Sequence, residues 1–352
     1  MVDINVAIVG CGNVAHGHFV AWRRIPYAKV VAVCDTNRKT VERVARDWKI
    51  PRSFTSVSKL SEFKEITLWD ICTPIQTHKD LATQAMKNGL DVLIEKPLTI
   101  TSREAEEIVE CQKATGQVAG VIHNWLFEPP ILRARAVVGH GDIGEIIGAH
   151  MSILHTKNEL MAINKDHWCH QLPGGRFSEM MIHPIYLLRC FLGEIEVANI
   201  EVSKIGEYQW MKSDELSATF RTGKKLGGVY VSFNAPRNST YIDIFGQEGI
   251  LRLDIITATL NFLPSVRMTR LNKAFDSIRQ ATQLSASTFK NALKILFRQW
   301  LDGHEMCIRL FAESVVNREK PPVTVQEGYE VVKVLEDVYR RIELKQKSTP
   351  TR

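Results

Sequence analysis

The feature that most constrains this chain is a glycine-rich turn between two apolar runs near the N-terminus. Residues 6–9 (Val-Ala-Ile-Val) suit a strand buried on both faces, and residues 30–33 (Val-Val-Ala-Val) suit a second strand that leads to Asp35. The turn, residues 10–15, reads Gly-Cys-Gly-Asn-Val-Ala and leads into a segment that can be helical. This order of strand, turn, helix and strand predicts a βαβ unit of a parallel sheet.

The turn has the residue types that suit a dinucleotide. Gly10 allows the tight turn out of the strand, and Gly12 lets the backbone approach a pyrophosphate that a side chain would block. Ala15 takes the third, small position, and the N–H groups at the helix start face the phosphates. Asp35, about 20 residues on, can accept hydrogen bonds from the adenosine ribose. The alternative is an ordinary glycine turn in another α/β protein. The expected cofactor contacts here are Gly10, Gly12, Asn13, Val14, Asp35 and Arg38.

Two charged residues bear on which dinucleotide binds. The Asp35 carboxylate favours the free 2′-hydroxyl of NAD, because its charge would repel a 2′-phosphate. Arg38 is close enough in sequence to accommodate that phosphate, so NADP stays possible. We expect NAD.

Bulk properties exclude several classes of protein. The 352 residues suffice for two domains, and 45% hydrophobic with 24% charged residues is typical of a soluble globular protein. A net charge of +6 is too mild to indicate nucleic-acid binding. Seven cysteines without a CxxC pair indicate a reducing compartment, and no apolar run approaches the ~20 residues of a membrane span. Residues 1–3 lead directly into the first strand, which leaves no room for a signal peptide. We expect a cytoplasmic protein.

Strands and helices alternate through the first third of the chain. Apolar strands are expected at 68–72, 91–94 and 118–122, with helices at 40–48, from His78 to Gly89, and at 101–114. The ligand of such a parallel sheet lies beyond the carboxyl ends of its strands. Four singled-out residues fall at those ends: Gly10, Asp35, Pro74 and Lys96.

The composition changes near His123, which predicts two domains of an α/β protein. Residues 1–122 are expected to form a Rossmann domain with a doubly wound parallel sheet. Residues 123–345 are expected to form an α+β domain with a large open, mostly antiparallel sheet, a helical insertion at about 271–301, and a tail at 346–352. One helix, about 177–191, is expected to precede Gly193. The expected strands of this domain are 147–154, 197–204, 216–221, 226–232, 241–245 and 250–253.

Several motifs occur together in a characteristic order. After the glycine turn come Thr73-Pro74 with His78, the triplet Glu95-Lys96-Pro97, and Gly174-Gly175 ahead of Glu179 and His183. In this order they resemble the glucose–fructose oxidoreductase / inositol dehydrogenase / MocA (Gfo/Idh/MocA) family over nearly the whole chain. The resemblance implies a Rossmann domain, a C-terminal α+β domain with an open sheet, and nicotinamide-dependent oxidation or reduction of a sugar or polyol carbon.

Lys96 is the expected proton acceptor. Hydride transfer from an alcohol carbon needs a group that takes the hydroxyl proton, and a lysine can do so if its surroundings lower its pKa from ~10.4. Lys96 follows a strand at the ligand edge, between Glu95 and the rigid ring of Pro97. The resemblance implies that it lies between the substrate hydroxyl and the nicotinamide. The other interpretation is a solvated surface lysine.

Glu179 and His183 are four residues apart, so a helix would place both on one face, together with Tyr186. His183 titrates near neutrality and can share the proton transfer or bind the reacting hydroxyl, and Glu179 can orient it. The family commonly has Asp at position 179, Gly at 181 and Asp at 186, where this chain has Glu, Met and Tyr. These departures indicate an unusual substrate. The alternative is a structural hydrogen bond. The expected catalytic residues are Lys96, His183 and Glu179, and the expected substrate contacts are Lys96, Trp168, Glu179, His183 and Tyr186.

The stretch His167-Trp168-Cys169-His170 allows a second interpretation. A metal-dependent enzyme could use His167, His170 and His183 as ligands. Because the family chemistry needs no metal, we expect none, and we expect Trp168 to be an apolar wall for a sugar ring. The remaining expected cofactor contacts are Thr73, Pro74, His78, Glu95, Lys96 and Asn124.

Two further predictions concern partners. An open sheet face usually needs a partner, so we expect a homodimer or homotetramer, and no nucleic acid.

In the insertion, one helical stripe is apolar (Phe289, Leu293, Leu296, Trp300) and another is basic (Lys290, Lys294, Arg298). The simpler interpretation is packing on the sheet or on a neighbouring subunit, and the alternative is contact with a membrane surface through 289–301. A nucleotide-binding sensor or scaffold without turnover is the competing function.

Overall fold

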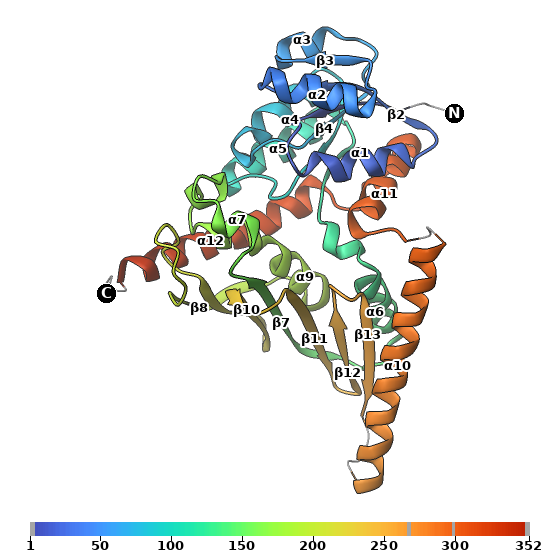
Figure 1. Ribbon diagram of the computed structural model, residues 1–352, viewed down its shortest axis with the longest axis vertical. Helices are drawn as coiled ribbons and strands as arrows, with labels where there is room; N and C mark the ends of the chain where they lie inside the picture. The colour runs from blue at the N-terminus through green and yellow to red at the C-terminus, as the bar shows by residue number, and fades with distance from the viewer. Residues whose placement is uncertain (1–3, 266–268, 298–299, 349–352) are drawn as a thin grey trace. The chain divides into compact units, whose positions relative to one another are not determined.

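The computed structural model describes residues 4–265, 269–297 and 300–348. It divides into two compact units (Figure 1): residues 1–124 with 301–336, and residues 125–300 with 337–352. The sequence analysis placed residues 301–336 in the second domain, whereas here they belong to the first unit. Arg298 and residues 349–352 of the expected tail lie outside the described residues.

The first unit is built on a six-stranded parallel sheet in the order β3-β2-β1-β4-β5-β6. This is the strand order of a dinucleotide-binding Rossmann fold, and it confirms the expected sheet. Its core strands are apolar on both faces because helices cover both. The strands are β1 (Ile4–Val9), β2 (Ala28–Cys34), β3 (Arg52–Phe54), β4 (Leu68–Ile71), β5 (Asp91–Ile94) and β6 (Ala119–Val121).

Local signals in the sequence explain where the helices of this unit begin and end. Asn37 caps α2, and Thr101 with Glu104 forms a capping box for α5, which stops at Gly116 in the left-handed conformation. The late helix α11 (Gly303–Asn317) contacts α1, which starts at the glycine turn. The other helices are α1 (Ala15–Arg23), α2 (Arg38–Trp48), α3 (Val57–Glu62), α4 (His78–Lys87) and α5 (Ser102–Thr115), with a 3-10 turn, η1 (Ile75–Thr77).

The second unit is built on a seven-stranded sheet in the order β13-β12-β11-β7-β10-β9-β8. Every neighbouring pair is antiparallel except β10 and β7, which confirms the mostly antiparallel sheet. The last strand, β13, did not appear in the expected set. The strands are β7 (Ile146–Thr156), β8 (Glu196–Ser203), β9 (Glu215–Thr222), β10 (Lys225–Ala235), β11 (Ser239–Gly246), β12 (Gly249–Asp254) and β13 (Thr259–Pro264).

Helices pack against this sheet at several points. Helix α9 contacts β7 and β10, α6 contacts β12 and β13, and α10 lies along the edge strand β13 (Figure 1). The helices that start in this unit are α6 (Pro129–His140), α7 (Leu160–Ile163), α8 (Arg176–Met180), α9 (Ile182–Leu192) and α10 (Arg270–Leu296), with the 3-10 turn η3 (Trp168–Gln171). The 3-10 turn η2 (Asn124–Phe127) begins at Asn124, which belongs to the first unit. Helix α12 (Val325–Ser348) begins in the first unit and ends in the second.

One expected helix is two. The sequence indicated a single helix over 177–191, but α8 ends at Met180 and α9 begins at Ile182. Glu179 is therefore on α8 and His183 on α9, and the prediction that one regular helix carries both was wrong. The sequence signal was continuous apolar character, which two short buried helices share with one long helix.

Candidate active site

The glycine turn has the geometry that the sequence predicted. Gly10 has φ +96°, and a Cβ there would lie 2.7 Å from the carbonyl carbon of Cys72 at the end of β4. A side chain at Gly10 would therefore collide with backbone. At Gly12, in contrast, a Cβ would meet no atom within 4 Å. The turn thus holds β1 close to β4 and leaves open space over Gly12.

The turn contains free hydrogen-bond donors and adjoins one carboxylate. Among the described residues, the backbone N–H groups of Gly12, Asn13 and Val14 donate to no acceptor. Asp35 accepts hydrogen bonds from the backbone N–H of Cys11 and of Asn37, each at 2.8 Å. Both oxygens keep lone pairs for ribose hydroxyls. Free N–H groups at a helix start suit a pyrophosphate, so the residues present fit NAD.

Arg38 lies on the first turn of α2. Its guanidinium makes an ion pair with Glu42 at 3.4 Å and is largely exposed. This pairing offsets the charge that a 2′-phosphate would need, and Asp35 repels such a phosphate. The geometry therefore fits NAD better than NADP.

His78 holds together two loops at the strand ends. The residue is 1% exposed; its Nδ1 lies 3.0 Å from the carbonyl oxygen of Pro97, and its Nε2 lies 2.9 Å from that of Thr73. Burial lowers the pKa of His78, although the Thr73 carbonyl opposes this shift. The ring therefore links the loop after β4, which contains Pro74, to the loop after β5.

Lys96 is half-buried at the carboxyl end of β5. Its backbone N–H donates to Glu95 Oε2 at 2.9 Å, and the Lys96–Pro97 peptide bond is cis. Glu95 itself is 4% exposed and points into the unit. The carboxylate of Glu95 thus holds the backbone of Lys96, as the sequence suggested, and belongs to a larger buried network.

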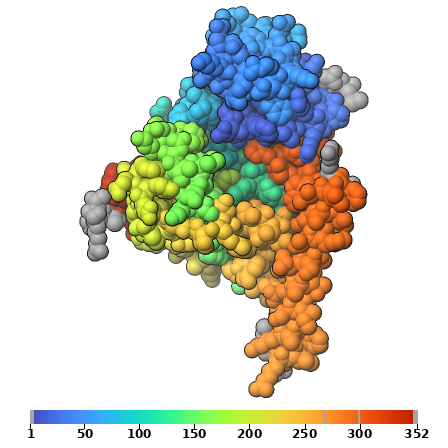
Figure 2. Space-filling model, viewed as in Figure 1, coloured from blue at the N-terminus to red at the C-terminus, as the bar shows by residue number. Residues whose placement is uncertain are grey.

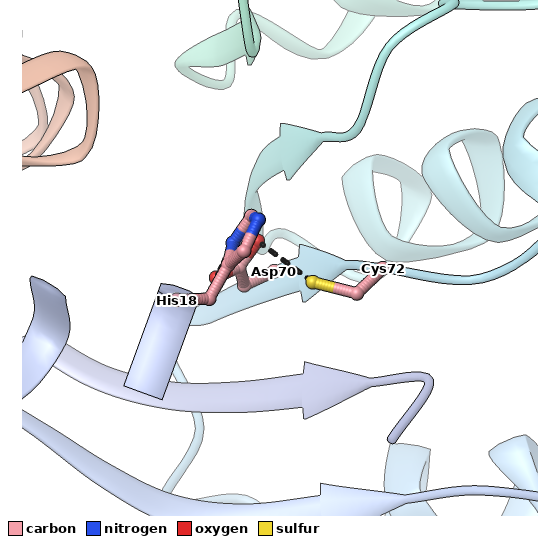
Figure 3. A group of neighbouring side chains, drawn as sticks. All are labelled: His18, Asp70 and Cys72. Atoms are coloured by element: carbon pink, nitrogen blue, oxygen red, sulfur yellow. Dashed lines mark hydrogen bonds and ion pairs between the residues drawn. The ribbon is translucent and has the colours of Figure 1, made fainter. Parts of the chain in front are cut away.

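That network centres on His18 in α1. Its Nδ1 lies 2.8 Å from Asp70 Oδ2, and its Nε2 lies 2.9 Å from Glu95 Oε1. Figure 3 shows His18 against Asp70 on β4, with the Cys72 thiol on the other carboxylate oxygen at 3.7 Å. Trp22 Nε1–H donates to Asp70 at 2.6 Å. His304 from α11 reaches Glu95 Oε1 at 3.0 Å.

The charges of this network support one another. Burial opposes a charge on His18, but the Asp70 carboxylate outweighs it and raises the pKa of His18 well above its ordinary value. Burial likewise opposes a charge on Glu95, but hydrogen bonds from His18 and His304 outweigh it, and the pKa of Glu95 falls well below its ordinary value. His18 is therefore an imidazolium that donates to two carboxylates, which fixes Glu95 directly before Lys96.

Asn124 adjoins the same network. Its Nδ2 lies 3.4 Å from His304 Nδ1, and its Oδ1 is buried and has no partner among the described residues. An unpaired buried acceptor needs a donor from a ligand or water. Asn124 therefore remains a candidate cofactor contact.

Two residue groups of this unit have donor atoms close enough together to share a cation: His18 with Asp70 and Cys72, and His18 with Glu95 and His304. Both include His18, whose two ring nitrogens already donate to carboxylates. Burial also raises the pKa of the Cys72 thiol, which disfavours the thiolate that a metal needs. The residues present therefore suit a proton-bearing network better than a metal centre.

In the second unit, His183 has a phenol as its partner. Its Nδ1 lies 2.6 Å from Tyr186 Oη, which accepts a hydrogen bond from the backbone N–H of Trp125 at 3.2 Å. The Trp125 ring stacks on His183 with centroids 4.1 Å apart. If Tyr186 donates to Nδ1, the proton of the neutral imidazole is on Nε2. Tyr186 thus holds the ring of His183 through Nδ1.

Glu179 is bound to a buried arginine. Arg176, 4% exposed, forms a short ion pair with Glu179 and a second one with Glu159 at 3.4 Å. Burial opposes the charge of Arg176, yet Glu179 and Glu159 raise its pKa. Its guanidinium also lies 5.1 Å from the centroid of Phe233. Arg176 is thus a charged partner of Glu179.

The residues of the metal-dependent alternative have separate partners. His167 Nδ1 accepts from the backbone N–H of Cys169, and His170 Nε2 lies 2.8 Å from the carbonyl of Met161. Neither groups with His183 in any cluster of metal ligands in the described part of the chain. Trp168 begins the 3-10 turn η3 and its ring lies against that of His167.

A family model described as an oxidoreductase family with an NAD-binding Rossmann fold matches residues 4–123, and a GFO/IDH/MocA C-terminal domain model matches residues 131–252. The chain belongs to the GFO/IDH/MocA family of oxidoreductases. The resemblance stated from the motifs is confirmed, as is the NAD-binding class of the first unit.

Individual GFO/IDH/MocA relatives are distant. "Oxidoreductase P35" of Formosa agariphila is 28% identical, over 73% of this chain and 81% of that protein. D-Apiose dehydrogenase of Rhizobium rhizogenes is 24% identical, over 72% of this chain and 74% of its own. Among solved structures, the WlbA dehydrogenase of Bordetella pertussis, in complex with NADH and UDP-GlcNAcA, superposes with a TM-score of 0.80 at 18% identity, over 97% of this chain and 96% of that chain. The last likeness concerns the fold.

Sequence reasoning missed the residues around Glu95. Asp70 offered a signal, because an acidic residue inside the apolar strand Leu-Trp-Asp-Ile needs a buried partner. His18 lies one turn into the helix after the glycine turn and was available as that partner. His304, more than 200 residues from Glu95, gave no local signal. Arg176, next to Gly175, was likewise not singled out.

Proposed function

We propose that this protein is an NAD-dependent dehydrogenase that moves a hydride between the nicotinamide and a hydroxyl-bearing carbon of a sugar, sugar nucleotide or polyol. The observation that carries the proposal is the position of Lys96. It follows β5 in the same unit as the glycine turn, and its backbone is held by Glu95. Relatives named as D-apiose and scyllo-inositol 2-dehydrogenases support this substrate class.

In this mechanism, the amine of Lys96 takes the proton of the substrate hydroxyl. NAD, when bound, supplies the hydride acceptor. Asp35 holds the ribose, and the N–H groups of Gly12, Asn13 and Val14 hold the pyrophosphate. The network of His18 and Glu95 keeps the Lys96 backbone in place. A positioned general base typically contributes a factor of about 100 to 10,000 to the rate.

We assign His183 as a second polar contact to the reacting hydroxyl. Tyr186 Oη lies 2.6 Å from its Nδ1 and orients the ring. Glu179 acts as a positioning residue through Arg176, and Trp168 supplies an apolar surface for a sugar ring.

The proposal extends to location and assembly. Among the described residues, no helix is both long and apolar enough to cross a membrane. The seven cysteines are all free, which supports a reducing, cytoplasmic location. Leu226, Tyr230 and Tyr241 on the central strands of the second sheet are each more than a third exposed, which supports a homo-oligomer that covers this face.

A screen tests the function. The purified protein is mixed with NAD and a panel of sugars, polyols and nucleotide sugars, and the formation of reduced nicotinamide is followed by absorbance. We expect turnover with one substrate class and its loss in Lys96→Met. Binding of NADH without turnover on the whole panel would instead favour a nucleotide-binding sensor, an outcome that the replacement of the usual Asp by Tyr186 makes worth testing.

A further inference from the structure

Helix α10 turns its polar side to the protein and its apolar side outward. The partly or fully buried residues of α10 recur every three or four positions and are polar. They are Asn272, Asp276, Gln280, Gln283, Ser287 and Asn291. The sequence analysis expected the apolar stripe to pack on the sheet or on a neighbouring subunit. For the sheet, that expectation was wrong.

The polar side of α10 faces the protein because it covers the edge strand β13. The Gln283 side chain accepts from the backbone N–H of Phe262 at 2.8 Å and donates to its carbonyl at 3.0 Å. Asn291 Nδ2 donates to the carbonyl oxygens of Thr257 and Ala258 at 3.2 and 3.0 Å. Edge strands carry unpaired backbone groups, and amide side chains satisfy them. The contacts that hold α10 in place thus account for its polar face.

The opposite side of α10 is exposed and carries large apolar side chains toward both of its ends; we call it the outer face. Its large side chains recur at spacings of three and four and are mostly more than half exposed, up to 73% for Leu296. Small residues, among them Thr282 and Ser285, fill the middle of the same side. Figure 2 shows α10 as an orange column with much of its length uncovered. The outer face consists of Leu271, Phe275, Ile278, Phe289, Leu293 and Leu296.

The charges beside the outer face indicate what covers it. The exposed charged side chains of α10 are all basic. By helical spacing, Arg270, Arg279 and Lys290 flank the outer face, whereas Lys273 and Lys294 fall on the polar side. Its single acidic residue, Asp276, is on the polar side and accepts from Gln280. Two copies of α10 paired through their outer faces would bring like charges together, without an acidic residue for interhelical pairing. An anionic surface, in contrast, complements this helix.

We propose that α10 docks the protein on an anionic lipid surface, with its outer face inserted at the level of the headgroups. An apolar face flanked by lysine and arginine is the pattern of a helix that lies in the membrane interface. The basic residues attract anionic lipid, and Phe275, Ile278 and Phe289 enter the boundary of the acyl chains. This docking is independent of the proposed dehydrogenase activity.

Vesicle flotation of the full-length protein tests the proposal. Vesicles of phosphatidylcholine alone are compared with vesicles that contain about 30% phosphatidylserine, at low and high salt. We expect flotation with the anionic vesicles and its loss at high salt, because salt screens the attraction. Failure to float with anionic vesicles, or equal flotation with both compositions, would overturn the proposal.

Two sets of variants separate the apolar and the charge contributions. The triple variant Phe275→Ser, Ile278→Ser, Phe289→Ser should abolish flotation. The triple variant Arg270→Glu, Arg279→Glu, Lys290→Glu should weaken it by on the order of 100-fold or more, because each basic residue near such a surface contributes about fivefold. The second set keeps the test valid if the first does not fold. Circular dichroism checks the fold of each.

Matched controls change the same chemistry elsewhere. Lys59→Glu, Lys64→Glu, Lys113→Glu alters the net charge equally at exposed sites of the first unit, and Ile205→Ser, Ile256→Ser, Leu344→Ser removes exposed apolar groups outside α10. Both controls should float like the wild type. If they lost binding equally, or if the α10 serine variant only turned an oligomer into a monomer by sedimentation velocity, the occupant would not be lipid.

Discussion

Substituting Gly10 and Gly12 separately by alanine should have opposite consequences, although both lie in one turn. At Gly10 the backbone has φ +96°, and a Cβ would lie 2.7 Å from backbone atoms of Cys72. The left-handed backbone costs about 1–2 kcal/mol and overpacking about 1–3 kcal/mol, so Gly10→Ala should destabilise the first unit by about 2–5 kcal/mol. At Gly12 a Cβ meets nothing within 4 Å, so stability should change by less than about 1 kcal/mol.

The two variants should also differ in cofactor binding. The new methyl group of Gly12→Ala occupies the space where the pyrophosphate approaches. Loss of one charged hydrogen bond costs about 1.5–3 kcal/mol, which raises the Kd for NADH about 10- to 100-fold. Denaturant unfolding gives the stability, and titration of NADH fluorescence with the folded protein gives the affinity. A Gly12→Ala protein with wild-type affinity, or a Gly10→Ala protein with wild-type stability, would refute the reasoning.

Two further predictions concern polar pairs. The pKa of His18 is raised, so its contribution to stability is complete below pH 6.5, its ordinary pKa, and is lost as the pH rises through the pKa of the folded state. The pKa of Glu95 is lowered, so its contribution is complete above pH 4.5, its ordinary pKa, and is lost as the pH falls through the pKa of the folded state. Denaturant unfolding as a function of pH should thus show both contributions in full between pH 4.5 and pH 6.5. At pH 6, Asp70→Asn should lower the free energy of unfolding by about 3–5 kcal/mol, because it leaves the buried charge of His18 without its partner. A variant as stable as the wild type would contradict the buried pair. Tyr186→Phe removes the partner of His183 Nδ1 and should reduce kcat about 10-fold and shift its pH profile with unchanged NADH affinity, whereas an unaltered pH profile would exclude a positioning role.

The first sheet could be predicted because each of its signals is local. Strands buried on both faces give continuous apolar runs, and the turn around Gly10, the cap at Thr101 and the stop at Gly116 depend on neighbouring residues. The strand ends then bring Asp35, Pro74 and Lys96 to one edge, because parallel strands end on the same side. The topology of the first sheet could thus be predicted from its local sequence pattern.

The parts that could not be predicted depend on distant contacts. The return of residues 301–336 to the first unit brings His304 to Glu95, and an apolar helical stripe in the sequence does not reveal this. The break between α8 and α9 is an exception with a local signal that was overlooked: Pro184 lacks the N–H that would bond to the carbonyl of Met180 in a continuous helix. In α10, an amphipathic pattern predicts a helix but not which face meets the protein, and here the hydrogen-bonding needs of a strand edge decide it.

The most direct test of the central claim is the rate of hydride transfer in Lys96→Met, measured in single turnovers with the substrate found by the screen. The account predicts that the rate falls by a factor of about 100 to 10,000 while the Kd for NADH stays within about twofold of the wild type. A variant that transfers hydride at the wild-type rate would show that Lys96 does not take the proton and would contradict the proposed mechanism.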